Sequence, residues 1–426
     1  MSTFPYASDA RGKPVAQIRR RPKDRKAQIT RAAAQIFGSQ GYHAASMEAI
    51  AARVGISAPA LYRHFPSKYE LFVAVVFGLG QHLVDATDFI DNVTDAELAA
   101  DPAAILARLI DKLTDAALAN REVGGLYRWQ GRHLQPADHT ELMDRMGVIN
   151  RRVQRPLVMI RPTLTAPQRW TLSAGLFSVV GSIIGHRPEL PEEEVRAVLA
   201  DAASALLATE LPTQGDPGTR SPSVWRIFTP DGGPYEALLH GAITLFGQQG
   251  YAATSVTQIA EAVGVPASGV YRYFSSKCDL LTTGLRRAVD RVAGELSAIG
   301  GVFTDPHQVL TRRVEAYVAT AFANPQLWVV YNTERVNLAP DDLEQLRDIV
   351  RTAVESWVEP LTSLRPELPA ARARFLVYAA TALVIDVSRM ARDGLLGGGG
   401  SDYGQLWMRQ LMESVLFGVA DSQAMV

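Results

Sequence analysis

Along most of the chain, apolar residues recur three and four positions apart, which is the spacing of one face of an α-helix. A clear example follows the acidic residues at 192–194, where Val195, Val198, Leu199 and Leu206 form one stripe. Outside residues 212–234, no run alternates apolar and polar side chains as a half-buried strand does. The pattern therefore predicts an all-α fold.

The N-terminal part of the chain predicts two short helices joined by a tight turn. Ser46 is a suitable N-cap for the first, whose apolar stripe ends before Gly55, a residue suited to a left-handed C-terminal position. Ser57 caps the second, which we expect to run through Phe65. Such a pair is a helix-turn-helix, and a capping box at Ser67–Glu70 then opens a long helix.

The sequence also repeats itself. Residues 37–72 align with residues 246–281 at a constant offset of 209, and 18 of the 36 positions are identical without a gap. A weaker similarity at an offset of 204 continues beyond, where Ala119-Asn120 matches Ala323-Asn324. The chain therefore consists of two complete units, each with a strongly similar head and a diverged helical body.

The repeat predicts a division into six segments. These are a basic N-terminal arm at 1–22, a first helix-turn-helix at 23–72, a helical body at 73–211, a linker at 212–234, a second helix-turn-helix at 235–281 and a second helical body at 282–426. The linker holds five prolines and four glycines in 23 residues, a composition that does not sustain a helix.

The strings FGSQGYHAASMEAIAARVGISAPALYRHFPSKYELF at 37–72 and VTQIAEAVGVPASGVYRYFSSKCDLL at 256–281 resemble the DNA-binding heads of the TetR/AcrR family. The Tyr-Arg, Phe and Ser-Lys spacing after the turn is the most specific part of this resemblance. It implies a recognition helix that enters the major groove of DNA, a helical body that binds a small molecule, and dimerisation through the last body helices.

A recognition helix needs small or polar side chains at its N-terminal end, because its backbone must approach base edges. Flanking side chains must contact phosphates, and the lysines at 68 and 277 each stand at a helix start, where phosphate is favoured. The predicted DNA contacts are Ser46, Ser57, Ala58, Pro59, Ala60, Tyr62, Arg63, His64 and Lys68 in the first head, and Ser255, Ala267, Ser268, Gly269, Tyr271, Arg272, Tyr273 and Lys277 in the second. The alternative is that the tyrosines at 62 and 271 pack in the core and the two lysines are merely solvated.

The resemblance assigns the dimer interface to residues 168–185 and 192–211 of the first body and to residues 372–392 and 403–419 of the second. A hydrophobic small-molecule effector is expected among aromatic residues of the bodies. The candidates are Tyr127, Trp129, Trp328 and Tyr331, with ordinary core packing as the alternative for each. Arg128, Arg132 and His133 are candidates to meet an acidic effector, with exposure to solvent or pairing with acids as the expected alternatives.

The net charge of −1 hides a local imbalance. Residues 1–75 carry twelve cationic and four anionic side chains, a net of +8, whereas residues 221–285 carry three and four, a net of −1. We therefore expect the first head to dominate DNA affinity.

Other features narrow the class of protein. A single cysteine, Cys278, excludes an internal disulfide framework and fits a reducing cytoplasm. The apolar stretches at 174–185 and 375–385 are too short to cross a bilayer. No cluster of metal ligands and no catalytic constellation is found in the sequence, so we expect no metal, no cofactor and no enzyme activity.

These observations predict a cytoplasmic repressor that binds a double-stranded DNA operator and responds to a small molecule. Its two units would pair within one chain as a pseudo-dimer, which could associate further into a homodimer. The competing hypothesis is a ligand-binding or protein-interaction scaffold in which one or both heads no longer bind DNA.

Overall fold

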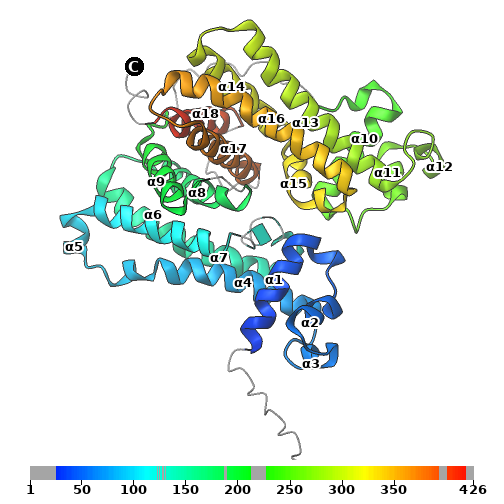
Figure 1. Cartoon of the computed structure of the whole chain (residues 1–426), viewed down its shortest axis with the longest axis horizontal. Helices are drawn as coiled ribbons and strands as arrows, with labels where there is room; N and C mark the ends of the chain where they lie inside the picture. Colours follow the sequence, from blue (N-terminus) through cyan, green and yellow to red (C-terminus); the bar gives the residue numbers. More distant parts are fainter. Residues whose placement is uncertain are drawn as a thin grey trace, which may run out of the picture.

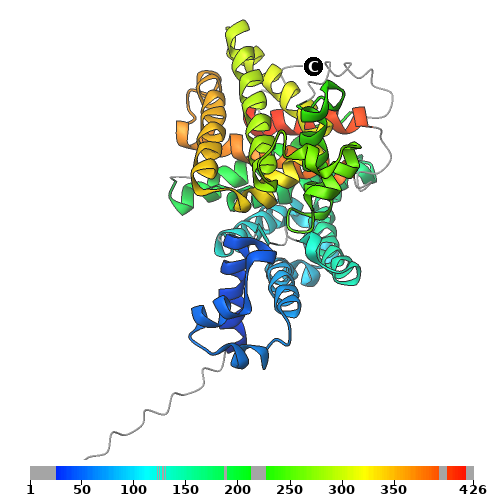
Figure 2. The ribbon, with the colours of Figure 1, turned by 90° about the vertical axis from the view of Figure 1, so that its right-hand side faces the viewer.

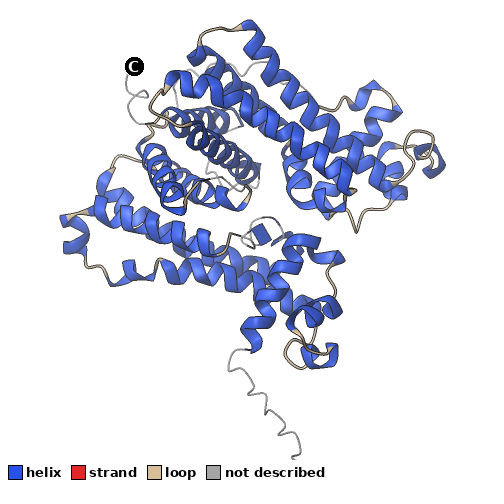
Figure 3. Ribbon diagram, in the orientation of Figure 1, coloured by secondary structure: helices blue, strands red, loops and turns tan. Residues whose placement is uncertain are grey.

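The computed structural model describes residues 25–121, 123, 125–126, 129, 131–186, 190–212, 227–392 and 401–418. Every regular element in these ranges is a helix, as Figure 3 shows. The predicted all-α class is confirmed. The basic arm at 1–22 and most of the linker lie outside the described residues.

The first unit runs from α1 to α9. Its helices are α1 (Arg25–Ala44), α2 (Met47–Val54), α3 (Ala58–Tyr62), α4 (Lys68–Ala86), α5 (Asp95–Ala100), α6 (Pro102–Ala119), α7 (Pro136–Ile160), α8 (Ala166–Gly181) and α9 (Glu192–Ala208), with the 3-10 turns η1 (Asp88–Asn92), η3 (Gly131–His133) and η4 (Ser182–Ile184).

The second unit repeats this order from the turn η5 onward. Its elements are η5 (Pro230–Gly232), α10 (Pro234–Gln249), α11 (Val256–Val263), α12 (Ala267–Val270), α13 (Lys277–Val302), α14 (Pro306–Ala323), α15 (Pro325–Glu334), η6 (Arg335–Asn337), α16 (Pro340–Leu364), α17 (Ala370–Arg392) and α18 (Ser401–Phe417).

Local chemistry accounts for the boundaries of the short head helices. The Ser46 hydroxyl accepts a hydrogen bond from the Ala49 backbone N–H, so it caps α2. Gly55 ends that helix at φ 73°, and Gly264 ends α11 at φ 74°, left-handed conformations that favour glycine. The expected run of α3 through Phe65 is longer than the helix, which ends at Tyr62. A hydrogen bond from the Phe65 N–H to the Leu61 carbonyl adds one further turn.

The two units meet through α8 and α9 of the first and α17 and α18 of the second. Figure 1 places these four helices together between the two sets of long body helices. One hydrophobic cluster contains side chains of both units, among them Leu176, Leu206, Leu383 and Leu411. The units therefore share a core, whereas each head packs around an apolar cluster of its own.

The heads lie away from this shared core. In Figure 1 both α3 and α12 lie on the side of the molecule opposite α9, and in Figure 2 the first head projects from the rest of the chain. Among the described helices, α4 alone is long and apolar enough to cross a membrane on length and composition. It packs against α1, α6 and α7, as a core helix does.

Candidate nucleic-acid interface

The recognition segment of the first head combines anchored and exposed side chains. Leu61 and Phe65 are buried and fix α3 to the head. Tyr62 is 44% exposed, and Arg63 and His64 beside it are exposed as well. The remaining predicted contacts are small: Ser57 and Pro59 are exposed, and Ala58 and Ala60 are half-buried. The small side chains therefore leave the backbone of this segment accessible to the edge of a base pair.

The second head presents the same arrangement. Val270 and Phe274 are buried, while Tyr271 is 60% and Tyr273 39% exposed. The other predicted contacts comprise exposed Ser268 and Arg272 and half-buried Ala267 and Gly269. Tyr62 and Tyr271 are not buried core residues, because 44% and 60% of their surfaces are exposed.

The predicted serine contacts sit at helix starts. Ser46 caps α2 as described, and Ser255 caps α11 by accepting the Gln258 N–H. Both hydroxyls stand where the positive end of a short helix dipole reaches the surface, which favours an anion such as phosphate. Contact of either serine with DNA stays a prediction.

The lysines predicted to clamp phosphate have partners inside the protein. The Lys68 ammonium donates to the backbone carbonyls of Tyr42, His43 and Ala45 at 3.0, 3.2 and 3.1 Å. It also lies 4.8 Å from the centre of the Tyr42 ring. Burial lowers the pKa of Lys68. Its ammonium therefore ties the start of α4 to the C-terminal end of α1, beyond the kink of that helix at Gly41.

The second head repeats this bond. Lys277 donates to the carbonyls of Tyr251 and Thr254, both at 2.8 Å, and lies 4.2 Å from the Tyr251 ring centre. Burial lowers the pKa of Lys277 too. Phosphate contact through either lysine stays a prediction, and it would have to compete with these hydrogen bonds.

The described heads differ in charge. Residues 25–75 contain six cationic and two anionic side chains, a net of +4, whereas residues 235–285 contain two and three, a net of −1. Because counterion release scales with neutralised phosphates, this difference favours the first head electrostatically even without the arm at 1–22.

Three of the four aromatic residues predicted to line an effector site are described, and the structure gives each a different set of neighbours. Tyr127 lies outside the described residues. Trp129 is half-buried beneath Arg389 of the second unit, whose guanidinium carbon is 5.1 Å from its ring centre. Trp328 packs against the shared core and Tyr331, on the same helix α15, against the cluster of the second head. Among the described residues, no group of His, Cys, Asp and Glu could hold a metal.

Both heads match a known protein family, and parts of the chain are similar to curated transcription regulators. The model of the family described as "Bacterial regulatory proteins, tetR family" matches residues 29–75 and 238–282. The transcriptional activator FasR of Mycolicibacterium smegmatis is 46% identical over 78 residues, 16% of this chain and 36% of that protein. The repressor KstR2 of the same species is 31% identical over 144 residues, 31% of this chain and 68% of that protein. The chain thus spans about a third of FasR and two thirds of KstR2.

Two solved structures align over less than half of the chain. The ketosteroid transcriptional regulator KstR2 of Mycobacterium tuberculosis is 20% identical and aligns over 44% of this chain and 97% of its own, with a TM-score of 0.38. The fatty acid degradation regulator FadR of Bacillus halodurans is 18% identical over 43% of this chain and 95% of its own, with a TM-score of 0.36.

Proposed function

The chain belongs to the tetR family of bacterial regulatory proteins and is a transcription regulator of that family, and from this premise we propose that its two heads bind one DNA operator together. The observation that carries the proposal is the pair of exposed recognition segments, 57–64 and 266–273, each held by buried neighbours. Both present small residues followed by an exposed Tyr-Arg pair, which suits backbone approach to bases with flanking phosphate contacts.

We infer that the two units form a pseudo-dimer within one chain. The support is the shared apolar core of α8, α9, α17 and α18, together with the ion pair between Arg372 and Glu194 across the units at 3.2 Å. The indole N–H of Trp407 on α18 also donates to the Pro212 carbonyl at 3.0 Å, where the first body ends.

Light scattering should therefore give a mass of 46.3 kDa or an even multiple of it. Crosslinking that captures the first body of one chain against the first body of another would contradict intrachain pairing.

We also propose that the protein acts as a cytoplasmic repressor released by a hydrophobic small molecule. The longer of the two curated matches is to a repressor, whereas the shorter is to an activator. An effector site is supported by the Trp328 indole nitrogen, which is buried beside Tyr317 without a hydrogen-bond partner. A buried polar group left unpaired is costly, and a ligand acceptor would satisfy it.

Mobility shift with the protein's own promoter region, titrated with salt, tests the DNA-binding proposal. We expect a specific shift whose affinity falls steeply with salt, and its loss when Tyr62 and Arg63 are both changed to alanine. A variant with Lys112→Ala, an exposed lysine of the body, is the control and should bind as the parent does. No specific shift at low salt would favour the scaffold hypothesis.

A further inference from the structure

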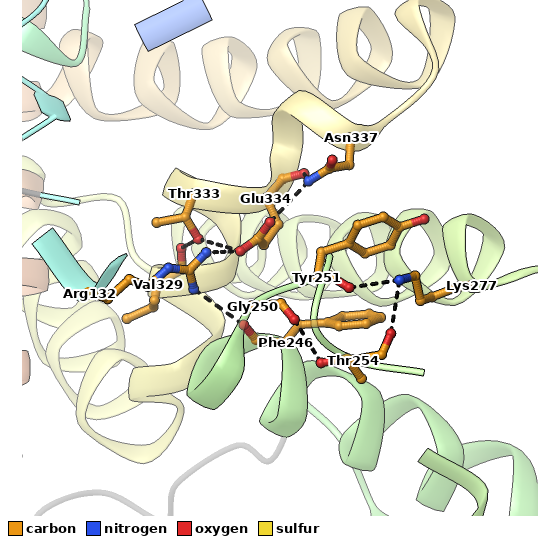
Figure 4. A network of polar contacts seen from close by, with 10 residues as sticks. All are labelled: Arg132, Phe246, Gly250, Tyr251, Thr254, Lys277, Val329, Thr333, Glu334 and Asn337. Carbon is orange, nitrogen blue, oxygen red and sulfur yellow. Dashed lines mark hydrogen bonds and ion pairs between the residues drawn. The ribbon is translucent and has the colours of Figure 1, made fainter. Parts of the chain in front are cut away.

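The 3-10 turn η3 of the first unit reaches into the second unit (Figure 4). The Arg132 guanidinium donates from Nη1 to the Phe246 carbonyl at 3.3 Å and from Nη2 to the Glu334 carboxylate. Phe246 lies in α10, the first helix of the second head, and Glu334 ends α15 of the second body. One side chain of the first unit therefore bonds the head and the body of the second at their junction.

Both partners in this cross-unit ion pair are largely withdrawn from water. The exposed fraction of the side chain is 20% for Arg132 and 7% for Glu334. The Glu334 carboxylate also accepts hydrogen bonds from the Thr333 hydroxyl at 3.3 Å and the Asn337 amide at 3.0 Å. Because a buried charge without a partner is strongly unfavourable, Glu334 holds Arg132 firmly in this position.

Gly250 of the second head lies beside the guanidinium. Gly250 follows α10 at φ 89°, a conformation that favours glycine, and a Cβ there would lie 3.6 Å from Arg132 Nη2 and 3.7 Å from the Glu334 carboxylate. Lys277 bonds the same turn from within the second unit, at Tyr251 and Thr254. The turn after α10 is thus held on one side by its own unit and on the other by Arg132.

The neighbouring residue of η3 contacts the first head. The His133 ring stacks on Tyr42 with centres 5.3 Å apart and meets His43 edge-on at 4.8 Å. Directly adjacent residues of one turn therefore touch the two heads. The equivalent turn of the second unit, η6, contacts α1 of the first head.

The polar bond has no symmetric counterpart. At the offset of 204, Val336 stands where Arg132 stands, and Gln130 stands where Glu334 stands. Val336 carries no charge and is 36% exposed. Val336 and Gln130 cannot form an equivalent ion pair. The contact between η3 and the second head is therefore the one of the two pseudo-equivalent contacts that has this ion pair.

We propose that Arg132 is a positioning residue that fixes the separation and relative orientation of the two heads, and that it thereby determines which spacing of operator half-sites the protein accepts. This inference rests on the proposed joint binding of one operator by both heads. Adding one base pair between half-sites moves the second by about 3.4 Å and rotates it about the DNA axis. Heads held at a fixed separation tolerate such a step poorly, whereas heads that move independently tolerate it.

The test uses the full chain and an operator selected from random double-stranded DNA, rebuilt with spacers two base pairs shorter to two longer. The parent protein should lose roughly tenfold in affinity for each step away from its preferred spacing. Arg132→Met should flatten this dependence to about threefold or less, while its affinity for a duplex carrying one half-site stays unchanged. Arg132→Lys, which keeps the charge without the planar fork, should fall between the two.

Arg372→Met is the matched control, because it removes the cross-unit ion pair with Glu194 in the four-helix contact, away from the heads. It should keep the sharp spacing preference. If Arg132→Met does not fold, Glu334→Gln replaces it, since it keeps the shape and removes the carboxylate. A sharp preference retained in Arg132→Met or in Glu334→Gln overturns the inference, as does a parent protein that binds the operator at every spacing equally. Absence of any operator binding by the parent would instead overturn the proposed function.

Discussion

The ammonium groups of Lys68 and Lys277 make equivalent hydrogen bonds to backbone carbonyls in the two heads. Each bonds carbonyls of the segment that follows a positive-φ glycine, Gly41 within α1 or Gly250 after α10, and each lies over the tyrosine ring of that segment. A lysine used in this way joins two helices that the helix-turn-helix separates in sequence. It contributes to the stability of the head whether or not DNA is present.

Lys68→Ala should therefore destabilise the first head. It removes three hydrogen bonds and leaves carbonyls without a donor, so we expect a loss of about 1–3 kcal/mol in the free energy of unfolding. Urea unfolding followed by circular dichroism measures it. Lys112→Ala should change stability by less than about 0.5 kcal/mol. Unchanged stability together with weaker operator binding in Lys68→Ala would instead support the phosphate contact.

The hydrogen-bond partners of the two lysines could not be predicted from the sequence. A lysine at a helix start is visible in the sequence, and so is its affinity for phosphate. Its carbonyl partners are 23 to 26 residues away in the chain, and only the packing of α1 against α4 brings them into reach. In the same way, the sequence allowed Arg132 to pair with an acid, but it did not reveal that the acid lies in the other unit.

His133 should make stability depend on pH. Burial, together with the nearby cations Arg132, His43 and Lys68, lowers its pKa to about 3. Between about pH 6.5 and 3, this histidine is protonated in the unfolded chain, where its pKa is near 6.5, but neutral in the folded chain. Stability is therefore complete above this window and falls as pH drops through it.

His133→Phe, which keeps an aromatic ring on Tyr42, should reduce the slope of unfolding free energy against pH by up to about 1.4 kcal/mol per unit in that window. Urea titrations at a series of pH values measure the slope. His139→Gln, at an exposed position of α7, is the control. Identical slopes for parent and His133→Phe would show that the histidine is not the group responsible.

At the scale of elements, caps and apolar stripes predicted several of the helix starts. Ser46 and Gly55 bound α2 as expected, and α9 begins at the acidic residue Glu192. The ends of some helices were less predictable. Helix α9 was expected to run to residue 211 but ends at Ala208, and no glycine in this stretch of the sequence marks that end. Local chemistry thus accounts for helix starts and for ends that carry a glycine such as Gly55, whereas an end without such a residue could not be placed from the sequence.

The close approach of α8 to its neighbours gives an element-scale prediction. A Cβ at Gly175 would lie 3.1 Å from methyl groups of both Leu206 and Leu383, the latter in the other unit. Gly175→Leu should therefore overpack the contact between units and lower the free energy of unfolding by about 1–3 kcal/mol. Gly78→Leu on α4, where a Cβ meets nothing within 4 Å, is the control for the same substitution. Equal effects of the two would contradict a tight inter-unit contact at Gly175.

For the whole molecule, the internal repeat predicted two units and their order, and the family resemblance named the helices at 168–185, 192–211, 372–392 and 403–419, which contact one another in the structure. The residues of the four-helix contact are apolar in both units, and such residues form ordinary cores equally well. Which side chains meet across the units, such as Leu383 against Gly175, depends on the packing of complementary surfaces and could not be predicted from the sequence pattern.

The charge difference between the heads predicts unequal contributions to operator affinity. Tyr62→Ala with Arg63→Ala should weaken binding more than Tyr271→Ala with Arg272→Ala, because the second head has little supporting positive field. Removing residues 1–22 should also flatten the dependence of affinity on salt by about 0.9 for each phosphate that the arm neutralises. Operator titration at fixed salt compares the pairs, and equal losses of affinity would show that the heads contribute alike.

The shared core of α8, α9, α17 and α18 has a consequence for gene dosage. A regulator assembled from two separate chains must meet its partner first, so its active fraction falls as the cell dilutes it. Two halves that pair within one polypeptide are made together, in equal number, and always within reach of each other. If the proposed pseudo-dimer binds its operator as a single chain, promoter occupancy at low protein levels rises with the first power of copy number rather than the square.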